Sequence, residues 1–148
     1  TFFCHGYNIN GVMLQLSDDL KSVSVVWRTD VLDTHHGGYV EVNGTIYGSN
    51  WINNNQGNWC AIDWNTGAKG YETTWTGGKG KGSIIAADGM LYCYDERRGV
   101  CSFGESRSRE VRYCQRVPYH EGRGAALGAP GYREWRAIYP SWVRLDGV

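Results

Sequence analysis

The sequence predicts an all-β fold, and three observations indicate it. Short runs of β-forming residues alternate with Asn-Gly, Asp-Gly and similar turn sequences through residues 1–101. The 148 residues include 7 Trp, 10 Tyr and 21 Gly, a composition that favours aromatic packing between strands joined by tight turns. Similar stretches also recur after roughly 45 residues, a spacing typical of repeated β-sheet units. The length suits one domain with a core.

The first strands are expected in residues 1–30, where the pattern is weakest. Phe2-Phe3 begins a strand, and two further strands are predicted at 12–16 and 23–27. Ser17-Asp18-Asp19 supplies the turn between them, because Ser and Asp side chains cap the N–H groups of a turn. This segment is therefore predicted to be a repeat unit that lacks its start.

Residues 39–75 are predicted to form the most complete unit, a meander of four short strands. The strands and turns are, in order, 39–42, Asn43-Gly44, 45–49, a polar loop, 59–63, Asn65-Thr66-Gly67 and a fourth run that ends at Trp75. Asn-Gly between β-formers is a strong hairpin signal, because both residues tolerate positive φ.

The pattern starts again in residues 83–101, and four matches in the same order indicate a repeat. The matched pairs are Asn43-Gly44-Thr45-Ile46-Tyr47 with Asp88-Gly89-Met90-Leu91-Tyr92, 45 positions later; Phe2-Phe3 with Ile46-Tyr47, 44 later; 11–18 with 57–64, 46 later; and Trp27 with Trp75, 48 later. A period of about 40–50 residues in short strands is typical of a β-propeller. The sequence therefore predicts a partial propeller of four-stranded antiparallel blades, about two blades and the start of a third, near 1–30, 39–75 and 83–101.

These motifs resemble the PQQ-like β-propeller repeat, written DG-x-LY, A-x-D-x-x-TG and a closing Trp. The corresponding segments here are Asn43-Gly44-Thr45-Ile46-Tyr47, Ala61-Ile62-Asp63-Trp64-Asn65-Thr66-Gly67 and Trp75. Asp33-Thr34-His35-His36-Gly37-Gly38-Tyr39 and Lys81-Gly82-Ser83-Ile84-Ile85 are similar to a subgroup of PQQ-binding-like repeat proteins. The resemblance covers about residues 1–100 and implies structural roles for Trp27, Gly44, Tyr47, Asp63, Gly67, Trp75, Gly89 and Tyr92.

The family includes quinoprotein alcohol dehydrogenases and non-catalytic outer-membrane assembly lipoproteins, so the resemblance implies a periplasmic or extracellular location. No cofactor is evident from the residues themselves, and PQQ with calcium is implied by the resemblance alone. The dehydrogenases carry two adjacent cysteines and a calcium site of Glu, Asn and Asp, whereas the five cysteines here are all apart. The cysteines show no zinc-ligand spacing, and no Ser-His-Asp, P-loop or dinucleotide motif is present.

The charge changes sign near residue 97. Residues 1–96 hold five basic and ten acidic residues, and residues 97–148 hold ten Arg, no Lys and five acidic residues. Residues 105–148 are predicted to be an irregular Arg-rich tail. The tail is interpreted as a basic coil, an anion-binding arm or an out-of-frame translation of the next blade, and the last is preferred.

The preference for a frame slip depends on two forced codons. One base later, Trp135 followed by Arg must encode Gly, as must Trp142 followed by Val, and the two glycines fall seven apart as in the family's paired strands. The slip is predicted near residues 99–105. The ten Arg would then be no nucleic-acid footprint, and no nucleic-acid partner is expected.

Two polar segments are candidate ligand-binding sites. His35 and His36 precede Gly37-Gly38, where glycine permits close approach of backbone to a ligand. Asn50 and Trp51 open a polar loop that suits a sugar or a planar ligand. The alternatives are backbone hydrogen bonding by one His and a long hairpin loop of turn-forming residues.

The predicted function is a non-catalytic scaffold or ligand-binding module, with no catalytic residue and no metal site assigned. A fragment of a PQQ-dependent alcohol or sugar dehydrogenase and a carbohydrate-binding propeller are the alternatives. Expected partners are the remaining blades of a longer chain, other envelope proteins or a small polar ligand. Because two blades leave sheet faces and edges uncovered, the chain is expected to associate or to have low stability.

Overall fold

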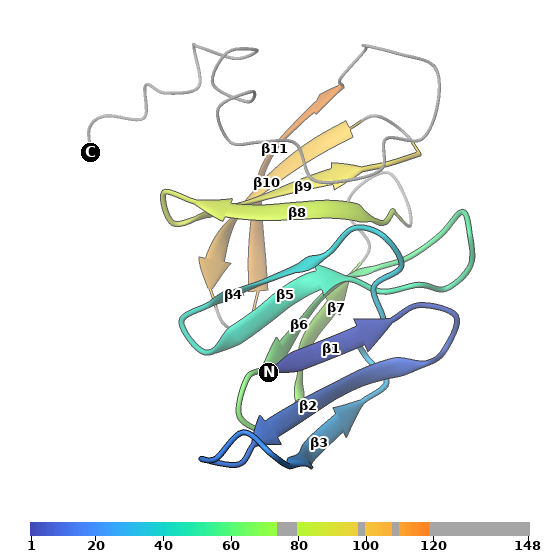
Figure 1. Cartoon of the computed structure of the whole chain (residues 1–148). Coiled ribbons are helices and arrows are strands. Elements are labelled where there is room, and N and C mark those ends of the chain that lie inside the picture. Colours follow the sequence, from blue (N-terminus) through green and yellow to red (C-terminus); the bar gives the residue numbers. More distant parts are fainter. Residues whose placement is uncertain (74–79, 98–99, 108–109, 119–148) are drawn as a thin grey trace.

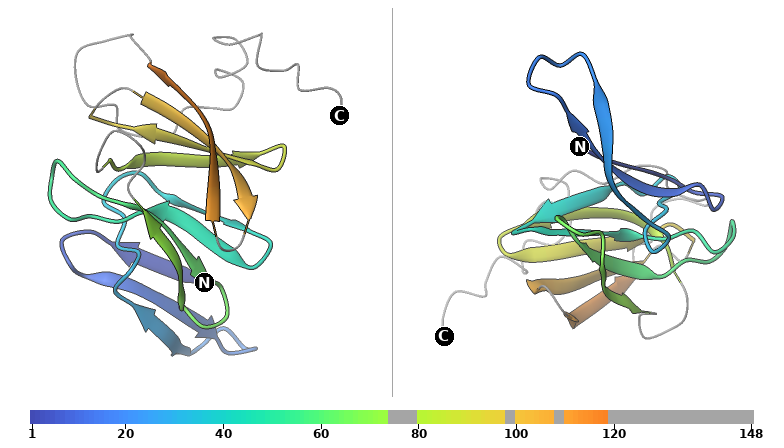
Figure 2. Two further views of the ribbon diagram at one scale, coloured as in Figure 1. Left: turned by 180° about the vertical axis from the view of Figure 1, so that it is seen from behind. Right: turned by 90° about the horizontal axis from the view of Figure 1, so that it is seen from below.

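The computed structural model describes residues 1–73, 80–97, 100–107 and 110–118, and every regular element there is a β-strand (Figure 1). The predicted all-β class is therefore confirmed. None of these residues belongs to a helix long and apolar enough to cross a membrane. The strands form three antiparallel sheets that follow one another in chain order (Figure 2).

Each sheet is a meander of consecutive strands. Sheet 1 holds β1 (Phe2–His5), β2 (Asn10–Leu16) and β3 (Val23–Thr29). Sheet 2 holds β4 (Tyr39–Val42), β5 (Thr45–Ser49), β6 (Trp59–Asp63) and β7 (Lys69–Thr73). Sheet 3 holds β8 (Gly82–Ala87), β9 (Met90–Asp95), β10 (Val100–Arg107) and β11 (Glu110–Pro118).

The predicted hairpin turns form as their chemistry requires. Asn43-Gly44 and Asp88-Gly89 all have positive φ, at 51°, 79°, 51° and 72° respectively, as a two-residue hairpin turn demands. The Asp63 carboxylate accepts hydrogen bonds from the backbone N–H groups of Asn65 and Thr66 at 2.9 and 2.8 Å. Turn chemistry thus fixes the register of sheets 2 and 3 locally.

A β-bulge at one shared position shows that the three sheets are copies of one pattern. In sheet 1, Met13 pairs with Trp27 and the next residue, Leu14, pairs with Val25. In sheet 2, Ala61 pairs with Tyr71 and Ile62 with Lys69. In sheet 3, Phe103 pairs with Gln115 and Gly104 with Tyr113. Each outer strand carries one extra residue at the same place, where a bulge bends the strand and increases its twist.

The bulge corrects the predicted spacing of the repeat. Phe2, Tyr47 and Tyr92 pair with Met13, Ala61 and Phe103, the residues that precede the bulge. Phe2 therefore corresponds to Tyr47 rather than to Ile46, and Trp27 corresponds to Tyr71 rather than to Trp75. Trp75 itself lies outside the described residues. A comparison of residue types alone could not find this register, because aromatic residues occupy neighbouring positions in each segment. Strand pairing shows which of these aromatic residues correspond.

Two separate cores hold the sheets together. The first joins sheets 1 and 2, and its buried members are Phe2, Met13, Leu32, Ile46, Cys60 and Ile62. The second joins sheets 2 and 3, and its buried members are Tyr47, Trp59, Ala61, Ile84, Leu91 and Cys93. Neighbouring strand residues face opposite ways, so Ile46 packs in the first core and Tyr47 in the second. Sheet 2 therefore contributes to both cores.

Sheet 3 corrects the predicted boundary of the tail. Strands β10 and β11 pair with each other and with β9, so the prediction of an irregular chain is wrong for residues 105–107 and 110–118. The predicted unit at 83–101 is the beginning of a longer sheet. Residues 119–148 lie outside the described part, and the frame slip stays a prediction.

Candidate functional site

Three loops bring aromatic side chains together at one end of sheets 1 and 2. Tyr7 lies between β1 and β2, His35 and His36 between β3 and β4, and Trp51 between β5 and β6. The Tyr7 ring centroid is 4.8 Å from that of His35 and 4.8 Å from that of Trp51. The His35 ring centroid is 3.7 Å from that of His36. We call these four side chains the loop cluster.

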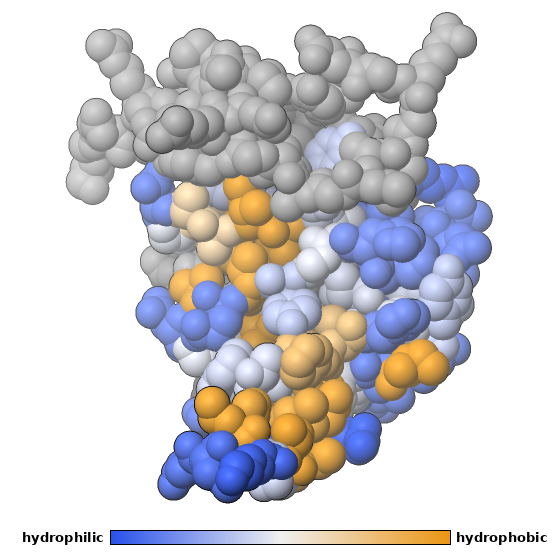
Figure 3. Space-filling view, viewed as in Figure 1, coloured by the Kyte–Doolittle hydropathy of each residue, from blue (hydrophilic) through white to orange (hydrophobic). Residues whose placement is uncertain are grey.

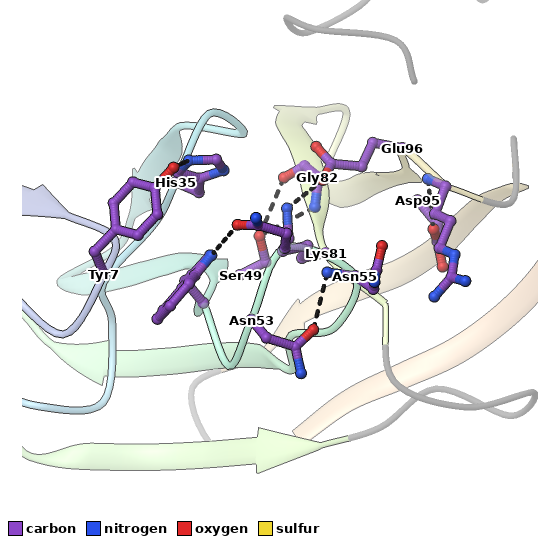
Figure 4. A network of polar contacts seen from close by, with 12 residues as sticks. Tyr7, His35, Ser49, Asn53, Asn55, Lys81, Gly82, Asp95 and Glu96 are labelled. Carbon is purple, nitrogen blue, oxygen red and sulfur yellow. Dashed lines mark hydrogen bonds and ion pairs between the residues drawn. The ribbon is translucent and has the colours of Figure 1, made fainter. Parts of the chain in front are cut away.

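Polar contacts fix the two central rings of the loop cluster. The Tyr7 hydroxyl and His35 Nε2 share a hydrogen bond of 2.8 Å (Figure 4). Burial, with His36 and the Lys81 ammonium nearby, holds the pKa of His35 below its usual value, so its imidazole is neutral at pH 7. Lys81 is buried and pairs with Glu96. The other His35 nitrogen, Nδ1, is buried with no hydrogen-bond partner among the described residues.

The backbone of Tyr7 is strained. Its φ is +62°, in the left-handed region that a bulky side chain seldom adopts, and Asn8 beside it has a φ of +61°. That conformation costs a non-glycine residue about 1–2 kcal/mol. Strain of this kind persists only where the surrounding contacts hold it, and it is concentrated at functional sites. Here it holds the phenol ring against His35 and Trp51.

Asp33 ties the three loops together. Its carboxylate is buried and accepts a 2.8 Å hydrogen bond from the Trp51 backbone N–H. The backbone N–H of Asn8 is a second donor to it. Burial nevertheless raises the pKa of the Asp33 carboxyl above its usual value, because desolvation outweighs these bonds. One carboxyl group thus joins the loops that carry Tyr7 and Trp51 to the segment that carries His35.

Asn50 does not belong to the ligand-binding surface in which the sequence places it. Its side chain is buried, and its Nδ2 donates to Glu72 Oε1 at 2.8 Å. Its Oδ1 accepts from the Asn58 backbone N–H at 2.7 Å. Asn50 therefore closes the base of the β5–β6 loop and lies outside the loop cluster. Hydrogen bonds from Asn58 and Asn50 help to keep the pKa of Glu72 below its usual value.

Trp27 lies at the junction between sheets 1 and 2. Its ring is 5.5 Å from that of Phe2, and its Nε1 donates to the Trp64 carbonyl at 3.1 Å. Gly67 has a φ of +71°, and a Cβ there would lie 2.5 Å from the Trp27 ring. The turn glycine of the repeat motif therefore also makes room for this ring. Gly44 and Gly89 have only the turn role, with open space around them.

The metal-ligating residue types of the described part lie apart from one another. No three of their His, Cys, Asp and Glu side chains form a group that could hold a metal ion. Cys4, Cys60 and Cys93 lie in three different sheets, so none of these three cysteines is adjacent to another. Burial raises the pKa of the Cys60 thiol, which suits a packing role.

Neither protein-family models nor curated proteins give a match to this chain. Its function is therefore inferred from its own geometry.

Sequence reasoning found three of the four members of the loop cluster and missed Tyr7 and the role of Asp33. Tyr7 belongs to no motif, and only the fold brings it to His35, 28 positions away. Asp33 is the first residue of the run Asp33-Thr34-His35-His36. An acidic residue before a paired His and a Gly pair could have been taken as an anchor for the loop.

Proposed function

We propose that this chain is a non-catalytic β-propeller repeat module that binds a small polar ligand with a flat face, such as a sugar ring, at the loop cluster. The observation that carries the proposal is Tyr7, held in a strained conformation between the rings of His35 and Trp51. Three separate loops, one buried carboxyl and a hydrogen bond serve that one arrangement.

The chemistry of the cluster suits a sugar. Aromatic faces attract the C–H side of a pyranose, and a ring hydroxyl can bond to a polar atom that lacks a partner. His35 Nδ1 lacks a partner among the described residues but is buried, so the exposed His36 ring is the group that a sugar hydroxyl can reach. His36 is exposed, and Trp51 is half-buried with Nε1 3.3 Å from Asn54 Oδ1. The cluster therefore offers both flat apolar surface and hydrogen-bonding groups.

The three sheets are consistent with propeller blades, which is the scaffold part of the proposal. They share one bulge, follow in chain order and pack face against face. In this arrangement β4 and β8, the first strands of their sheets, would line the axis of the ring. The resemblance to the PQQ-like repeat supports the same architecture and a place in the periplasm or outside the cell.

The test is a titration of tryptophan fluorescence with glucose, N-acetylglucosamine and maltose, with glycerol as a ligand that has no ring. A saturable change with a dissociation constant on the order of 1 mM, about −4 kcal/mol, is expected for the sugars. Tyr7→Asn should abolish it, since Asn removes the ring but accepts the left-handed backbone. Trp64→Phe is the matched control, because Trp64 is exposed on the far turn of sheet 2.

Two results would overturn the proposal. The first is the absence of any saturable change with the three sugars. The second is a change that survives in Tyr7→Asn. PQQ with calcium and a dye acceptor is assayed in parallel, and dye reduction would establish the dehydrogenase alternative in place of a non-catalytic module.

A further inference from the structure

Two exposed imidazoles lie at the edge of the loop cluster. His5, at the end of β1, has its ring centroid 6.1 Å from that of Tyr7. The ring centroid of His36 is 3.7 Å from that of His35, and both His5 and His36 are exposed. Figure 3 shows mainly hydrophilic residues on the side of the molecule where the β1–β2 and β5–β6 loops lie. The surroundings of the aromatic rings are therefore polar and can become basic.

The carboxylates beside the loop cluster are already bound. Asp33 is 4% exposed and accepts a 2.8 Å hydrogen bond from the Trp51 backbone N–H. Glu96 is paired with the Lys81 ammonium, and the two side chains are 11% and 5% exposed. Glu72 accepts hydrogen bonds from two asparagine side chains. These acids have partners, so a positive charge on an exposed imidazole is left for a ligand to neutralise.

A fall in pH adds such a charge. Histidine is the side chain that gains a proton between pH 8 and pH 5. Burial holds the pKa of His35 below its usual value. The charged groups that act on this ring are His36, Lys81, Glu96 and His5, of which Glu96 raises the pKa and the other three lower it. The inner ring therefore stays neutral over more of this pH range, and the added charge falls on the exposed imidazoles.

We propose that the ligand of the loop cluster is a sugar that carries a carboxylate, a hexuronate, and that His36 and His5 bind it more tightly as the pH falls. This inference rests on the proposed sugar binding and specifies the class of sugar. The pyranose ring packs on the aromatic faces of Tyr7 and Trp51. The carboxylate accepts a hydrogen bond from His36, and a protonated imidazole makes that bond charge-assisted.

A carboxylate fits this site better than a phosphate group. Phosphate is commonly bound by guanidinium or ammonium groups, which are charged at all pH values of interest. The Lys81 ammonium is buried and engaged with Glu96, so it does not face a ligand at the surface. The exposed basic groups of the site are imidazoles, each with at most one charge. A uronate carboxylate remains ionised at pH 5.5, since free carboxyl groups titrate near about pH 4.

The test compares glucose with glucuronate, which differ only in the carboxylate at C6. Titrations of tryptophan fluorescence on the full chain at pH 7.5 and pH 5.5 give the dissociation constant of glucose divided by that of glucuronate. This ratio should rise about threefold or more at pH 5.5, because opposite charges in contact at a surface favour binding about fivefold. Most of the rise should disappear in 1 M NaCl, where charges are screened beyond about 3 Å.

Single variants assign the effect to the imidazoles. In His36→Gln, which keeps a hydrogen-bonding side chain without a titratable group, the ratio should lose most of its pH dependence. His5→Gln should remove a smaller part, because the His5 ring is 6.1 Å from that of Tyr7. Lys21→Gln is the matched control, since it removes a positive charge between β2 and β3, at the opposite end of sheet 1, and should leave the ratio unchanged. Circular dichroism checks the strands at both pH values.

The outcomes separate this inference from the sugar binding on which it rests. A saturable response to glucose with the same ratio at both pH values would overturn the carboxylate assignment and leave the proposed function standing. An undiminished rise in His36→Gln or in 1 M NaCl would overturn it as well, and the salt measurement needs no variant. Tighter binding of glucose 6-phosphate than of glucuronate at pH 5.5 would replace the carboxylate by a phosphate. No response to any of these sugars at either pH would overturn both proposals.

Discussion

Sheets 1 and 2 follow one pattern, but their surroundings differ. Leu14 in sheet 1 and Ile62 in sheet 2 hold the same position beside the same bulge. Ile62 is fully buried against sheet 1, whereas Leu14 is half-buried and its cross-strand partner Val25 is exposed. The difference lies in the neighbour and not in the strand, because both strands keep their apolar residues at this position.

The comparison shows that the repeated pattern decides which face of a sheet a residue occupies. Whether that residue is buried depends on the neighbouring sheet. Both sides of sheets 1 and 2 carry apolar side chains, as a sheet packed between two others requires. A sheet of this kind is stable to the extent that its neighbours cover it. Single substitutions can separate the contribution of the covered face of sheet 2 from that of the face of sheet 1 that points away from sheet 2.

The largest effect is expected where sheets 2 and 3 approach through their backbones. A Cβ on Gly37 would collide with the Gly82 carbonyl, so Gly37→Ala must push the two sheets apart. We expect a loss of about 3 kcal/mol or more in the free energy of unfolding, measured by urea denaturation. Gly44→Ala is the control, because a Cβ there would lie in open space. Its expected cost is a backbone strain of about 1–2 kcal/mol from the φ of +79°. Equal losses in the two variants would contradict the close contact.

The next effect compares the two faces directly. Ile62→Ala should cost about 2–5 kcal/mol, because it leaves a cavity between sheets 1 and 2. Leu14→Ala, at the matching position on the face of sheet 1 that points away from sheet 2, should cost about 1 kcal/mol or less, because Leu14 is only half-buried. Denaturation at low protein concentration measures both. Similar losses would mean that this face of sheet 1 is covered as well.

A smaller effect is expected at the carboxyl group that ties the loops together. Asp33→Ala leaves the Trp51 N–H without its 2.8 Å acceptor and should cost about 1–3 kcal/mol. It should also loosen the loop cluster, which a weaker fluorescence response to sugars would report. Asp33→Asn keeps an acceptor oxygen and should preserve both properties. Loss of the response in the Asn variant would show that the charge matters, not the hydrogen bond.

The smallest effect is a pH dependence with a definite sign. Burial raises the pKa of Asp33 above 3.8, so the folded state holds its proton more tightly than the unfolded state. The stability that Asp33 contributes is then fully present below pH 3.8 and is lost as pH rises through the raised value. Compared with the Asp33→Asn variant, the unmodified protein should show a falling free energy of unfolding as the pH rises through the raised pKa. Denaturation curves at several pH values test this, and a relative gain would contradict the raised pKa.

Much of the fold could be predicted from the sequence because turn chemistry is local. Asn43-Gly44 and Asp88-Gly89 carry their own conformational preference, so the hairpins and the repeat could be recognised without the fold. The bulges could not, because no residue type marks them: Val26, Gly70 and Cys114 occupy the three equivalent places. The end of sheet 3 was also missed, since β11 is rich in charged residues.

The candidate site was predicted in part for a similar reason. His35, His36 and Trp51 stand out by residue type in polar loops, and the structure brings them together. Tyr7 joins them only through contacts between distant loops. Asn50 resembles a ligand-binding residue in the sequence, but its hydrogen bonds to Glu72 and Asn58 close a loop instead.

The repeated bulge is the central claim, and cross-strand nuclear Overhauser contacts test it most directly. They would be measured on the full chain by nuclear magnetic resonance. The structure predicts contacts between Met13 and Trp27, Ala61 and Tyr71, and Phe103 and Gln115, each followed by a skipped residue on the outer strand. Regular pairing without the skip would contradict the shared pattern. Missing contacts between β10 and β11 would remove sheet 3 from it and favour the out-of-frame interpretation of the tail.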